Sequence, residues 1–428
     1  MTACACSQAV ILVGGEGTRL RPITSRVPKP VAPVVGRPFI TYVLESLQRH
    51  GVQRVVFSTG YLAEAIEAEV GTGARFGLDV RYVVEESPLG TAGALKNAQG
   101  ELAEGCFLAF NGDVLTDADL TALVAFHQEK GGLATILLTP VDDPRRYGLV
   151  QLNEDGSVAE FLEKPGAEWV GSALINAGVY VLEREVLDLI PAGRMYSVER
   201  DVFPGLAAIG KLFGFADSGY WRDIGTPESY LEAHFDLLQG LLKTPVADEL
   251  GDRYLYVAPT ARVAAGARIV PPAHIGDDVE VEDGARVGPL AVIGRGSRVA
   301  AGAQVIESVV QDDVTIGCGA TVQRSVLVRR AAVGGASHVS HAVIGEGCSV
   351  GAHNVLANGV CLFPGVQLPD GSVKFRDIDG GESAVGAAYA PRGSGARGAR
   401  CVTDAAPALT DLGGRRRESG EKRTDAPA

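Results

Sequence analysis

Hydrophobic residues follow two different spacings along this chain, one in each half. In the first 240 residues, short apolar runs that predict buried strands alternate with stretches of helical periodicity. The predicted strands cover 9–13, 55–57, 82–84 and 107–110, and the predicted helices cover 39–47, 62–70 and 91–98. This alternation predicts an α/β fold with a Rossmann-like, mostly parallel sheet. Ligands are then expected beyond the carboxyl ends of the strands.

From Val263 onward, aliphatic residues recur at every sixth position. Eight of them follow without interruption from Val263 to Val305, and the spacing then becomes five, six and six as far as Leu356. A six-residue repeat is the signature of a parallel β-helix, whose coils have three short faces with the aliphatic residue pointing inward. We therefore predict a left-handed parallel β-helix with about five coils between Val263 and Leu356.

These patterns divide the chain into three parts and a joint. We expect a first domain at 1–240, a linker at 241–255, a β-helix domain at 256–372 and a tail at 373–428. The tail consists mainly of Gly, Ala, Arg, Asp and Ser and holds hardly any apolar residues. It is predicted to be disordered, because such a composition cannot bury enough apolar surface to fold.

The net charge of the chain indicates which classes of binding partner are not expected. It has 39 basic and 52 acidic residues and a net charge of −13, so neither nucleic acid nor an anionic membrane is an expected partner. No apolar run approaches the roughly 18 residues that a membrane helix needs, and the first residues do not resemble a signal peptide. We expect a cytoplasmic protein.

The seven cysteines are scattered and odd in number, so no disulfide framework is expected. Cys6 is expected to lie in a loose N-terminus. Cys106, in an apolar segment, is interpreted as a small core residue.

A glycine-rich segment follows the first predicted strand. It contains three glycines and two arginines: Gly14, Gly15, Gly17, Arg19 and Arg21. Glycines directly after a buried strand let backbone N–H groups approach phosphate oxygens, and Lys29 adds a further positive charge nearby. The segment is not a Walker A loop, which needs Gly-Lys-Ser/Thr, nor a dinucleotide fingerprint, which needs a glycine where Leu20 stands. It predicts a phosphate-binding loop of another kind.

The stretch 11–38 closely resembles the opening of the sugar-1-phosphate nucleotidyltransferases, G-x-G-T-R-L-x-P-x-T followed by P-K. Further motifs of that family follow within the first 240 residues, at 85–93, 111–113, 147–148, 161–165, 176–180 and 220–227. The residues of these motifs, and the hexapeptide domain that follows them, are most similar to those of the mannose-1-phosphate guanylyltransferases.

The resemblance implies a role for each matching residue. Nucleotide binding is implied for Gly14, Gly15, Gly17, Thr18, Arg19, Glu85, Gly90 and Thr91. Catalysis is implied for Arg19, Lys29 and Asp113, and sugar-phosphate binding for Gly148, Glu163, Lys164 and Asn176. Asp113 and Asp223 are the implied ligands of Mg²⁺, which prefers carboxylate and phosphate oxygens. Taken singly, Asp113 could instead cap a helix that begins near Asp117, and Asp223 could be a turn residue.

The implied reaction joins a hexose 1-phosphate to a nucleoside triphosphate and releases pyrophosphate. Its nucleophile is a phosphate oxygen that is already ionised, so no general base is needed, and His50, His127 and His234 indeed lie outside every motif. Glu85 favours guanine, because a carboxylate can accept both N1–H and N2–H of that base, whereas thymine and uracil present one N–H between two carbonyls. The expected substrates are GTP and mannose 1-phosphate.

Three alternatives remain open. The chain could be a thymidylyl-, uridylyl- or adenylyltransferase that uses glucose 1-phosphate, or a non-catalytic subunit that senses a sugar nucleotide. The β-helix could also hold an acyltransferase site with His274, His338, His341 or His353 as its base. We expect instead that the β-helix joins copies of the chain into a homo-oligomer, because its flat faces and open ends suit subunit contacts.

Overall fold

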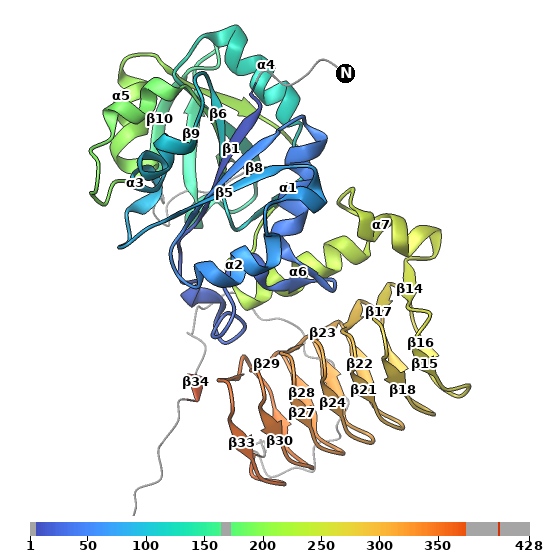
Figure 1. Ribbon diagram of the computed structural model, residues 1–428. Helices are drawn as coiled ribbons and strands as arrows, with labels where there is room; N and C mark the ends of the chain where they lie inside the picture. The colour runs from blue at the N-terminus through green and yellow to red at the C-terminus, as the bar shows by residue number, and fades with distance from the viewer. Residues whose placement is uncertain (1–5, 164–172, 374–400, 403–428) are drawn as a thin grey trace, which may run out of the picture.

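The computed structural model describes residues 6–163, 173–373 and 401–402 (Figure 1). Nearly all of the tail predicted at 373–428 lies outside the described residues, and so does Lys164. A sheet covered by helices comes first along the chain, and a stack of short parallel strands follows it. The predicted α/β fold followed by a parallel β-helix is confirmed, and the stack is consistent with the left-handed form.

The first half is built on a nine-stranded sheet with the order β10-β9-β11-β6-β1-β4-β5, in which β8 also pairs with β11 and β12 pairs with β8. Its strands are β1 (Gln8–Val13), β4 (Arg54–Thr59), β5 (Asp79–Val84), β6 (Phe107–Asn111), β8 (Ala134–Val141), β9 (Gly148–Leu152), β10 (Val158–Glu163), β11 (Ala173–Leu182) and β12 (Leu212–Ala216). The neighbouring strands β6, β1, β4 and β5 are parallel. β11 pairs antiparallel with β6.

Alternate residues of β1 point into two separate cores. Ala9, Ile11 and Val13 contribute to the core on one face of the sheet, and Val10 contributes to the core on the other. Such alternation follows from the two-residue period of a strand. The helices that cover these faces are α1 (Phe39–Arg49), α2 (Ala63–Val70), α3 (Gly90–Asn97), α4 (Leu120–Lys130), α5 (Phe203–Ala208) and α6 (Pro227–Leu238). With both faces covered, the parallel strands are shielded from water as this fold requires.

The carboxyl ends of the parallel strands meet at one edge of the sheet. β1 ends at Val13, β5 at Val84 and β6 at Asn111, and each is followed by one of the sequence motifs. A small antiparallel pair, β7 (Val114–Thr116) with β13 (Trp221–Asp223), brings Asp223 opposite Val114 at the same edge. The topology therefore gathers motifs that are far apart in the sequence.

The second half consists of three parallel sheets that wind around one apolar interior. One sheet holds β14 (Leu255–Val257), β17 (Ala273–Ile275), β20 (Ala291–Ile293), β23 (Ser308–Val310), β26 (Val326–Leu327), β29 (Val343–Ile344), β32 (Cys361–Leu362) and β34 (Cys401–Val402). The second holds β15 (Arg262–Val263), β18 (Glu280–Val281), β21 (Arg298–Val299), β24 (Thr315–Ile316), β27 (Ala332–Val333), β30 (Ser349–Val350) and β33 (Gln367–Leu368). The third holds β16 (Arg268–Ile269), β19 (Arg286–Val287), β22 (Gln304–Ile306), β25 (Thr321–Gln323), β28 (His338–Ser340) and β31 (Val355–Leu356).

The β-helix continues beyond the range from Val263 to Leu356 in which about five coils were predicted. The second sheet alone stacks seven strands among the described residues. Val257, Leu362 and Leu368 continue the six-residue spacing on both sides of that range, within the limits of 256–372 expected for the β-helix domain. Val263, which was expected in the buried interior, is 38% exposed. It lies on β15, which is the first strand of its sheet and has no preceding coil to cover it.

The two halves share one apolar core. Phe235 of α6 belongs to the same cluster of buried residues as Val292, Val309 and Val326 of the β-helix. Polar contacts frame this interface, since Gln311 donates a hydrogen bond to the Tyr230 hydroxyl at 3.2 Å. The segment predicted as a linker, 241–255, contains the helix α7 (Pro245–Leu250).

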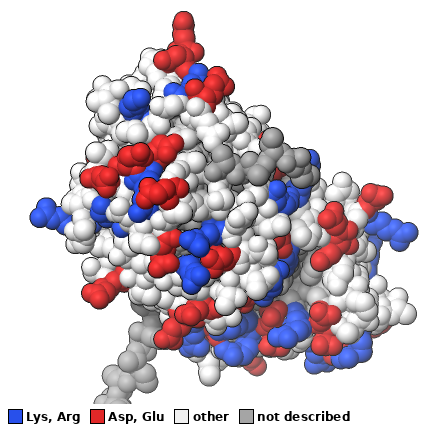
Figure 2. All heavy atoms as spheres, turned by 45° about the horizontal axis from the view of Figure 1, so that its top comes forward, with Lys and Arg blue, Asp and Glu red and all other residues white. Residues whose placement is uncertain are grey.

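Acidic and basic side chains are interspersed on the face of the molecule seen in Figure 2. On the β-helix, Arg298 pairs with both Glu280 and Glu282, which lie one coil earlier. Among the described residues, none of the helices has the length and apolar composition to span a membrane.

Candidate active site

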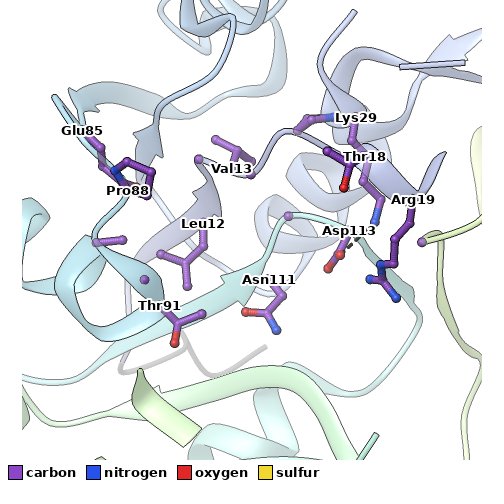
Figure 3. A pocket seen from close by; sticks show the side chains of 18 residues that line it. Leu12, Val13, Thr18, Arg19, Lys29, Glu85, Pro88, Thr91, Asn111 and Asp113 are labelled. Carbon is purple, nitrogen blue, oxygen red and sulfur yellow. Dashed lines mark hydrogen bonds and ion pairs between the residues drawn. The ribbon is translucent and has the colours of Figure 1, made fainter. Parts of the chain in front are cut away.

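A pocket of about 470 Å³ opens at the carboxyl edge of the parallel strands (Figure 3). It is enclosed by the segments that follow β1, β5 and β6. Its lining comprises Leu12, Val13, Gly14, Gly15, Gly17, Thr18, Arg19, Lys29, Pro30, Glu85, Pro88, Gly90, Thr91, Ala94, Asn111, Gly112, Asp113 and Gly225. All the residues predicted to bind nucleotide are among them, together with the three predicted to be catalytic.

Glycines shape the loop between β1 and Lys29. Gly17 has a φ of +60°, in the left-handed region that favours glycine, and its carbonyl accepts a hydrogen bond from the Thr24 hydroxyl at 2.8 Å. A Cβ atom at Gly14 would lie 2.7 Å from Oε1 of Glu85. The loop therefore keeps its backbone close to the floor of the pocket, where its N–H groups can approach an anion.

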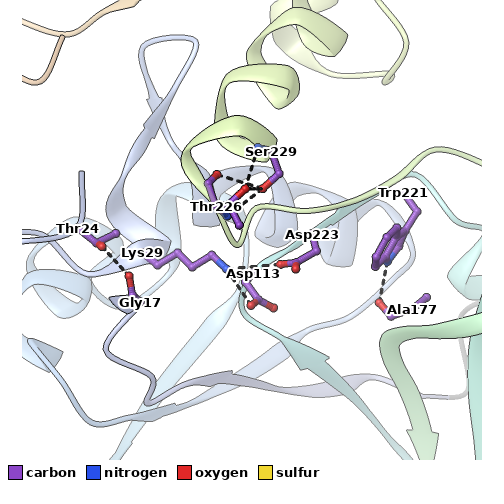
Figure 4. A network of polar contacts seen from close by, with 9 residues as sticks. All are labelled: Gly17, Thr24, Lys29, Asp113, Ala177, Trp221, Asp223, Thr226 and Ser229. Atoms are coloured by element: carbon purple, nitrogen blue, oxygen red, sulfur yellow. Dashed lines mark hydrogen bonds and ion pairs between the residues drawn. The ribbon is translucent and has the colours of Figure 1, made fainter. Parts of the chain in front are cut away.

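Lys29 lies between two carboxylates at one end of this pocket (Figure 4). Its side chain is largely buried, and Nζ donates a hydrogen bond to Oδ2 of Asp113 at 2.8 Å. Nζ also lies 3.6 Å from Oδ1 of Asp223. The backbone supports this arrangement, because the N–H of Ile224 donates to the carbonyl of Asp113 at 3.0 Å. The structure thus brings together the two aspartates that the sequence analysis predicted to share a metal.

Neither alternative role for these aspartates fits the contacts. The N-cap of α4 is Asp119, whose Oδ1 accepts hydrogen bonds from the N–H groups of Thr121 and Ala122. Asp113 is therefore not the helix cap. Asp223 is the last residue of β13 and makes its closest polar approach to Lys29.

Neighbouring groups act in opposite directions on the pKa of Asp223. Burial and the nearby charge of Asp113 raise the pKa of Asp223, while Lys29 and Arg19 act in the opposite direction. Oδ1 of Asp223 is buried without a hydrogen-bond partner among the described residues, because Nζ of Lys29 at 3.6 Å attracts it without bonding to it. A divalent cation shared by both carboxylates fits this unsatisfied oxygen. The described residues hold no cluster of three or more His, Cys, Asp or Glu ligands, so a cation held here would take its other ligands from phosphate or water oxygens.

Glu85 lies at the opposite end of the pocket from Lys29 (Figure 3) and is half-buried. Its Oε1 accepts a hydrogen bond from the Ser58 hydroxyl at 3.0 Å, and its Oε2 accepts one from the N–H of Leu89 at 3.1 Å. These bonds fix the carboxylate. Each oxygen retains a lone pair that can accept from a ligand.

Thr91 joins a polar network that the sequence analysis did not anticipate. Its hydroxyl donates to Oε2 of Glu199 at 2.8 Å, and Oε1 of Glu199 accepts from the Tyr180 hydroxyl at 3.1 Å. The Tyr180 hydroxyl in turn accepts from Nδ2 of Asn176 at 2.9 Å. Glu199 therefore connects Thr91, on the predicted nucleotide side, to Asn176, on the predicted sugar side. It lies in a Ser-Val-Glu-Arg segment with no glycine-rich or Lys-Pro signal that could have identified it.

Three of the four predicted sugar-phosphate residues, Gly148, Glu163 and Asn176, lie on neighbouring strands of the sheet. Gly148 begins β9 and pairs with Glu163 at the end of β10, and Asn176 lies on β11, the strand next to β9. Gly148 and Asn176 are absent from the pocket lining given above. Asn111 is a polar lining residue to which the predictions gave no role, although it lines the pocket and its Oδ1 is buried without a partner among the described residues. Its place in the Asn-Gly-Asp motif was the available signal.

The chemistry of the pocket is that of phosphate handling. Lys29 and Arg19 supply positive charge, the glycine loop supplies backbone donors, and two carboxylates can hold a cation. None of His50, His127 and His234 lines the pocket. A site with this composition, on a Rossmann-like sheet, is that of an enzyme that transfers phosphorus-containing groups by positioning and charge neutralisation.

Comparison with known proteins identifies the family. Residues 8–240 match the family model of the nucleotidyl transferases, and residues 269–374 match that of the GMPPB C-terminal domain. The chain belongs to the nucleotidyl transferase family, and it is a nucleotidyltransferase enzyme.

Its curated relatives are similar over most of their length. The mannose-1-phosphate guanylyltransferase of Mycobacterium tuberculosis is 40% identical over 370 residues, which cover 86% of this chain and 97% of the relative. A probable mannose-1-phosphate guanylyltransferase of Oryza sativa is 34% identical over 373 residues, with 86% and 98% covered. The UTP–glucose-1-phosphate uridylyltransferase of Synechocystis is also 34% identical, over 330 residues that cover 73% of this chain and 85% of the relative.

Proposed function

We propose that this enzyme makes GDP-mannose from mannose 1-phosphate and GTP and releases pyrophosphate. The observation that carries the proposal is the position of Lys29 between Asp113 and Asp223, at the end of a pocket whose floor is the glycine loop. The names of the relatives from Mycobacterium tuberculosis and Oryza sativa support this choice of substrates.

In this mechanism a phosphate oxygen of mannose 1-phosphate attacks the α-phosphorus of GTP, and the bond to the β-phosphate oxygen breaks. The attacking oxygen is ionised, so the pocket needs no base. The N–H groups of the loop at Gly14, Gly15 and Gly17, with Thr18 and Arg19, hold the triphosphate and the leaving pyrophosphate. The ammonium group of Lys29 holds an α-phosphate oxygen and offsets the charge that develops there.

Asp113 and Asp223 are the proposed ligands of a magnesium ion. When bound, Mg²⁺ neutralises phosphate charge and acts as a Lewis acid toward the phosphoryl oxygens. The buried, unpartnered Oδ1 of Asp223 and the adjacent Asp113 carboxylate supply the hard oxygen ligands that this ion prefers.

Base and sugar recognition are assigned to opposite sides of the pocket. Glu85 accepts N1–H and N2–H of guanine, and Gly90 and Thr91 belong to the same base-binding loop. On the sugar side, Gly148, Glu163, Lys164 and Asn176 are the proposed contacts of mannose 1-phosphate.

The test is pyrophosphate release measured across a grid of nucleoside triphosphates and hexose 1-phosphates with Mg²⁺. The reaction of GTP with mannose 1-phosphate should dominate. Lys29→Ala and Asp113→Asn should each lower kcat by about 10² or more, whereas Lys243→Ala and Asp252→Asn, at exposed sites, should not change it. Each control removes the same charge at a position outside the pocket.

Other outcomes would redirect the proposal. Selectivity for UTP or dTTP with glucose 1-phosphate would keep the mechanism and overturn the assignment of Glu85, a result that the similarity to a uridylyltransferase makes worth seeking. If the folded protein releases no pyrophosphate with any substrate pair but still binds a sugar nucleotide, the chain is a regulatory subunit instead.

We propose also that the β-helix assembles copies of this chain into a homo-oligomer in the cytoplasm. Its first coil leaves Val257 and Val263 partly exposed at an open end, where a second copy could cover them. The mass of the intact protein, measured by light scattering at several concentrations, tests this assembly.

A further inference from the structure

Two thiols lie in contact at the end of the sheet opposite the pocket. Sγ of Cys6 is 2.7 Å from Sγ of Cys106. Cys6 precedes β1 and is fully buried, and Cys106 precedes β6 and is half-buried. β1 and β6 are parallel neighbours in which Ala9 pairs with Leu108, so the register itself brings the two cysteines together. The loose N-terminus expected around Cys6 is therefore wrong at this residue.

A buried glutamine holds this juxtaposition in place. The Oε1 atom of Gln8 accepts a hydrogen bond from the N–H of Ala103 at 2.8 Å, and its Nε2 donates to the carbonyl of Ala103 at 3.0 Å. Nε2 also lies 3.5 Å from the carbonyl oxygen of Cys106. The first residue of β1 is thus bonded to the segment before β6 independently of the sulfur atoms.

We propose that Cys6 and Cys106 form a redox-active pair that peroxide converts reversibly into a disulfide. The half-buried Cys106 sulfur attacks one peroxide oxygen, the O–O bond breaks, and the second oxygen leaves as water, so that Cys106 becomes a sulfenic acid. The Cys6 sulfur then attacks the Cys106 sulfur, the S–O bond breaks, and a second water leaves with the proton of the Cys6 thiol. Two thiols lose two electrons, and one peroxide gains them.

The surroundings favour Cys106 as the sulfur that reacts first. The hydrogen bond from the Cys6 thiol is the main cause that lowers the pKa of Cys106, against the opposing effect of burial. A disulfide holds its sulfurs about 2.0 Å apart, so closing the bond requires only a small movement of sulfur. Because the loops of the pocket follow the other ends of β1 and β6, the disulfide should leave nucleotidyl transfer unchanged and raise the temperature of unfolding.

The test is a peroxide titration of the full chain followed by alkylation and tryptic mapping without reductant. The expected product joins peptides 1–19 and 97–130, two hydrogens lighter than the sum of their masses, and dithiothreitol should separate them. Peptide 1–19 also contains Cys4, so single variants assign the bond. Cys6→Ser should abolish the linked peptide and let Cys106 oxidise further to a sulfinic acid, whereas Cys4→Ser should retain it.

Cys318→Ser is the matched control, because Cys318 is exposed and lies on the β-helix. This variant should form the linked peptide as the unmodified sequence does, and peroxide should raise its unfolding temperature equally. Two results would overturn the proposal: no linked peptide at peroxide concentrations that oxidise Cys318, or a linked peptide that persists in Cys6→Ser. Thermal unfolding of each reduced variant verifies that it is folded, so a missing bond cannot be attributed to misfolding.

Discussion

Glu85 shows how one residue can combine a structural and a recognition role. Its two carboxylate oxygens accept hydrogen bonds from Ser58 and Leu89, and its position leaves no room for a side chain at Gly14. These bonds hold the loop after β5 against the end of β4 and fix its turn at Leu89. They also orient the carboxylate toward the pocket, where its remaining lone pairs can meet a base.

Glu85→Gln should therefore reduce the preference for GTP over UTP. An amide offers one acceptor oxygen where the carboxylate offers two, so we expect kcat/KM for GTP to fall by about tenfold or more, with a smaller change for UTP. Steady-state pyrophosphate release with both nucleotides measures the ratio. Glu86→Gln, at the exposed neighbouring position, should leave the ratio unchanged, and an unchanged ratio in Glu85→Gln itself would remove Glu85 from base recognition.

Single residues also mark the limit of prediction from sequence. Asp113 and Asp223 could be predicted as partners because each belongs to a motif with a known chemistry. The contact between Cys6 and Cys106 could not, since it depends on the register of two strands separated by about one hundred residues. Glu199 was missed for a similar reason, because only the folded chain brings it to Thr91 and Tyr180.

At the scale of elements, α6 links the pocket to the β-helix. It begins four residues after Asp223 with a capping box, in which the Thr226 hydroxyl accepts from the N–H of Ser229 and the Ser229 hydroxyl accepts from the N–H of Thr226. Two of the unpaired N–H groups at this helix start are thereby satisfied. The cap fixes the point at which the chain leaves the turn that follows Asp223.

Thr226→Ala should lower the free energy of unfolding by about 1 kcal/mol, because it removes the hydroxyl that caps α6. Urea unfolding followed by circular dichroism measures this loss. Thr226→Ser retains a hydroxyl and should recover most of the stability. Equal losses in both variants would show that the methyl group of Thr226, rather than its hydroxyl, is the stabilising feature.

The spacing of apolar residues predicted helices and strands well wherever a single period was maintained along the segment. The helix α1 and the buried strands β1, β4 and β6 follow their apolar patterns closely, and the hexapeptide repeat predicted the β-helix. The repeat continues on both sides of the range from Val263 to Leu356 in which the coils were counted. The helix α7 was not foreseen in the predicted linker, where Pro245 and Thr244 form its first turn and cap.

At the scale of the whole molecule, two buried histidines lie where the halves meet. His234 of α6 packs against Tyr230, and His274 of β17 stacks on Tyr256. Burial lowers the pKa of each to about 4. Both imidazoles are therefore neutral in the folded protein near neutral pH, whereas in the unfolded chain they titrate near 6.5.

Stability should consequently fall as the pH falls from 6.5 toward 4. In this range the unfolded chain binds protons that the folded protein excludes, and the loss at pH 5 should be roughly 2 kcal/mol for each histidine. Urea unfolding at pH 7 and pH 5 measures it. The double variant His234→Gln/His274→Gln should lose less between the two pH values, and an identical loss would assign the pH dependence to other groups.

The shared core has a consequence for how such chains can arise. Phe235 of the first half and Val309 and Val326 of the second belong to one buried cluster, and Gln311 bonds to Tyr230 across the boundary. A recombination that replaced the β-helix with one from a distant relative would pair surfaces that do not fit. The two halves are therefore expected to be inherited together, and substitutions on α6 should be matched by substitutions on the coils that face it.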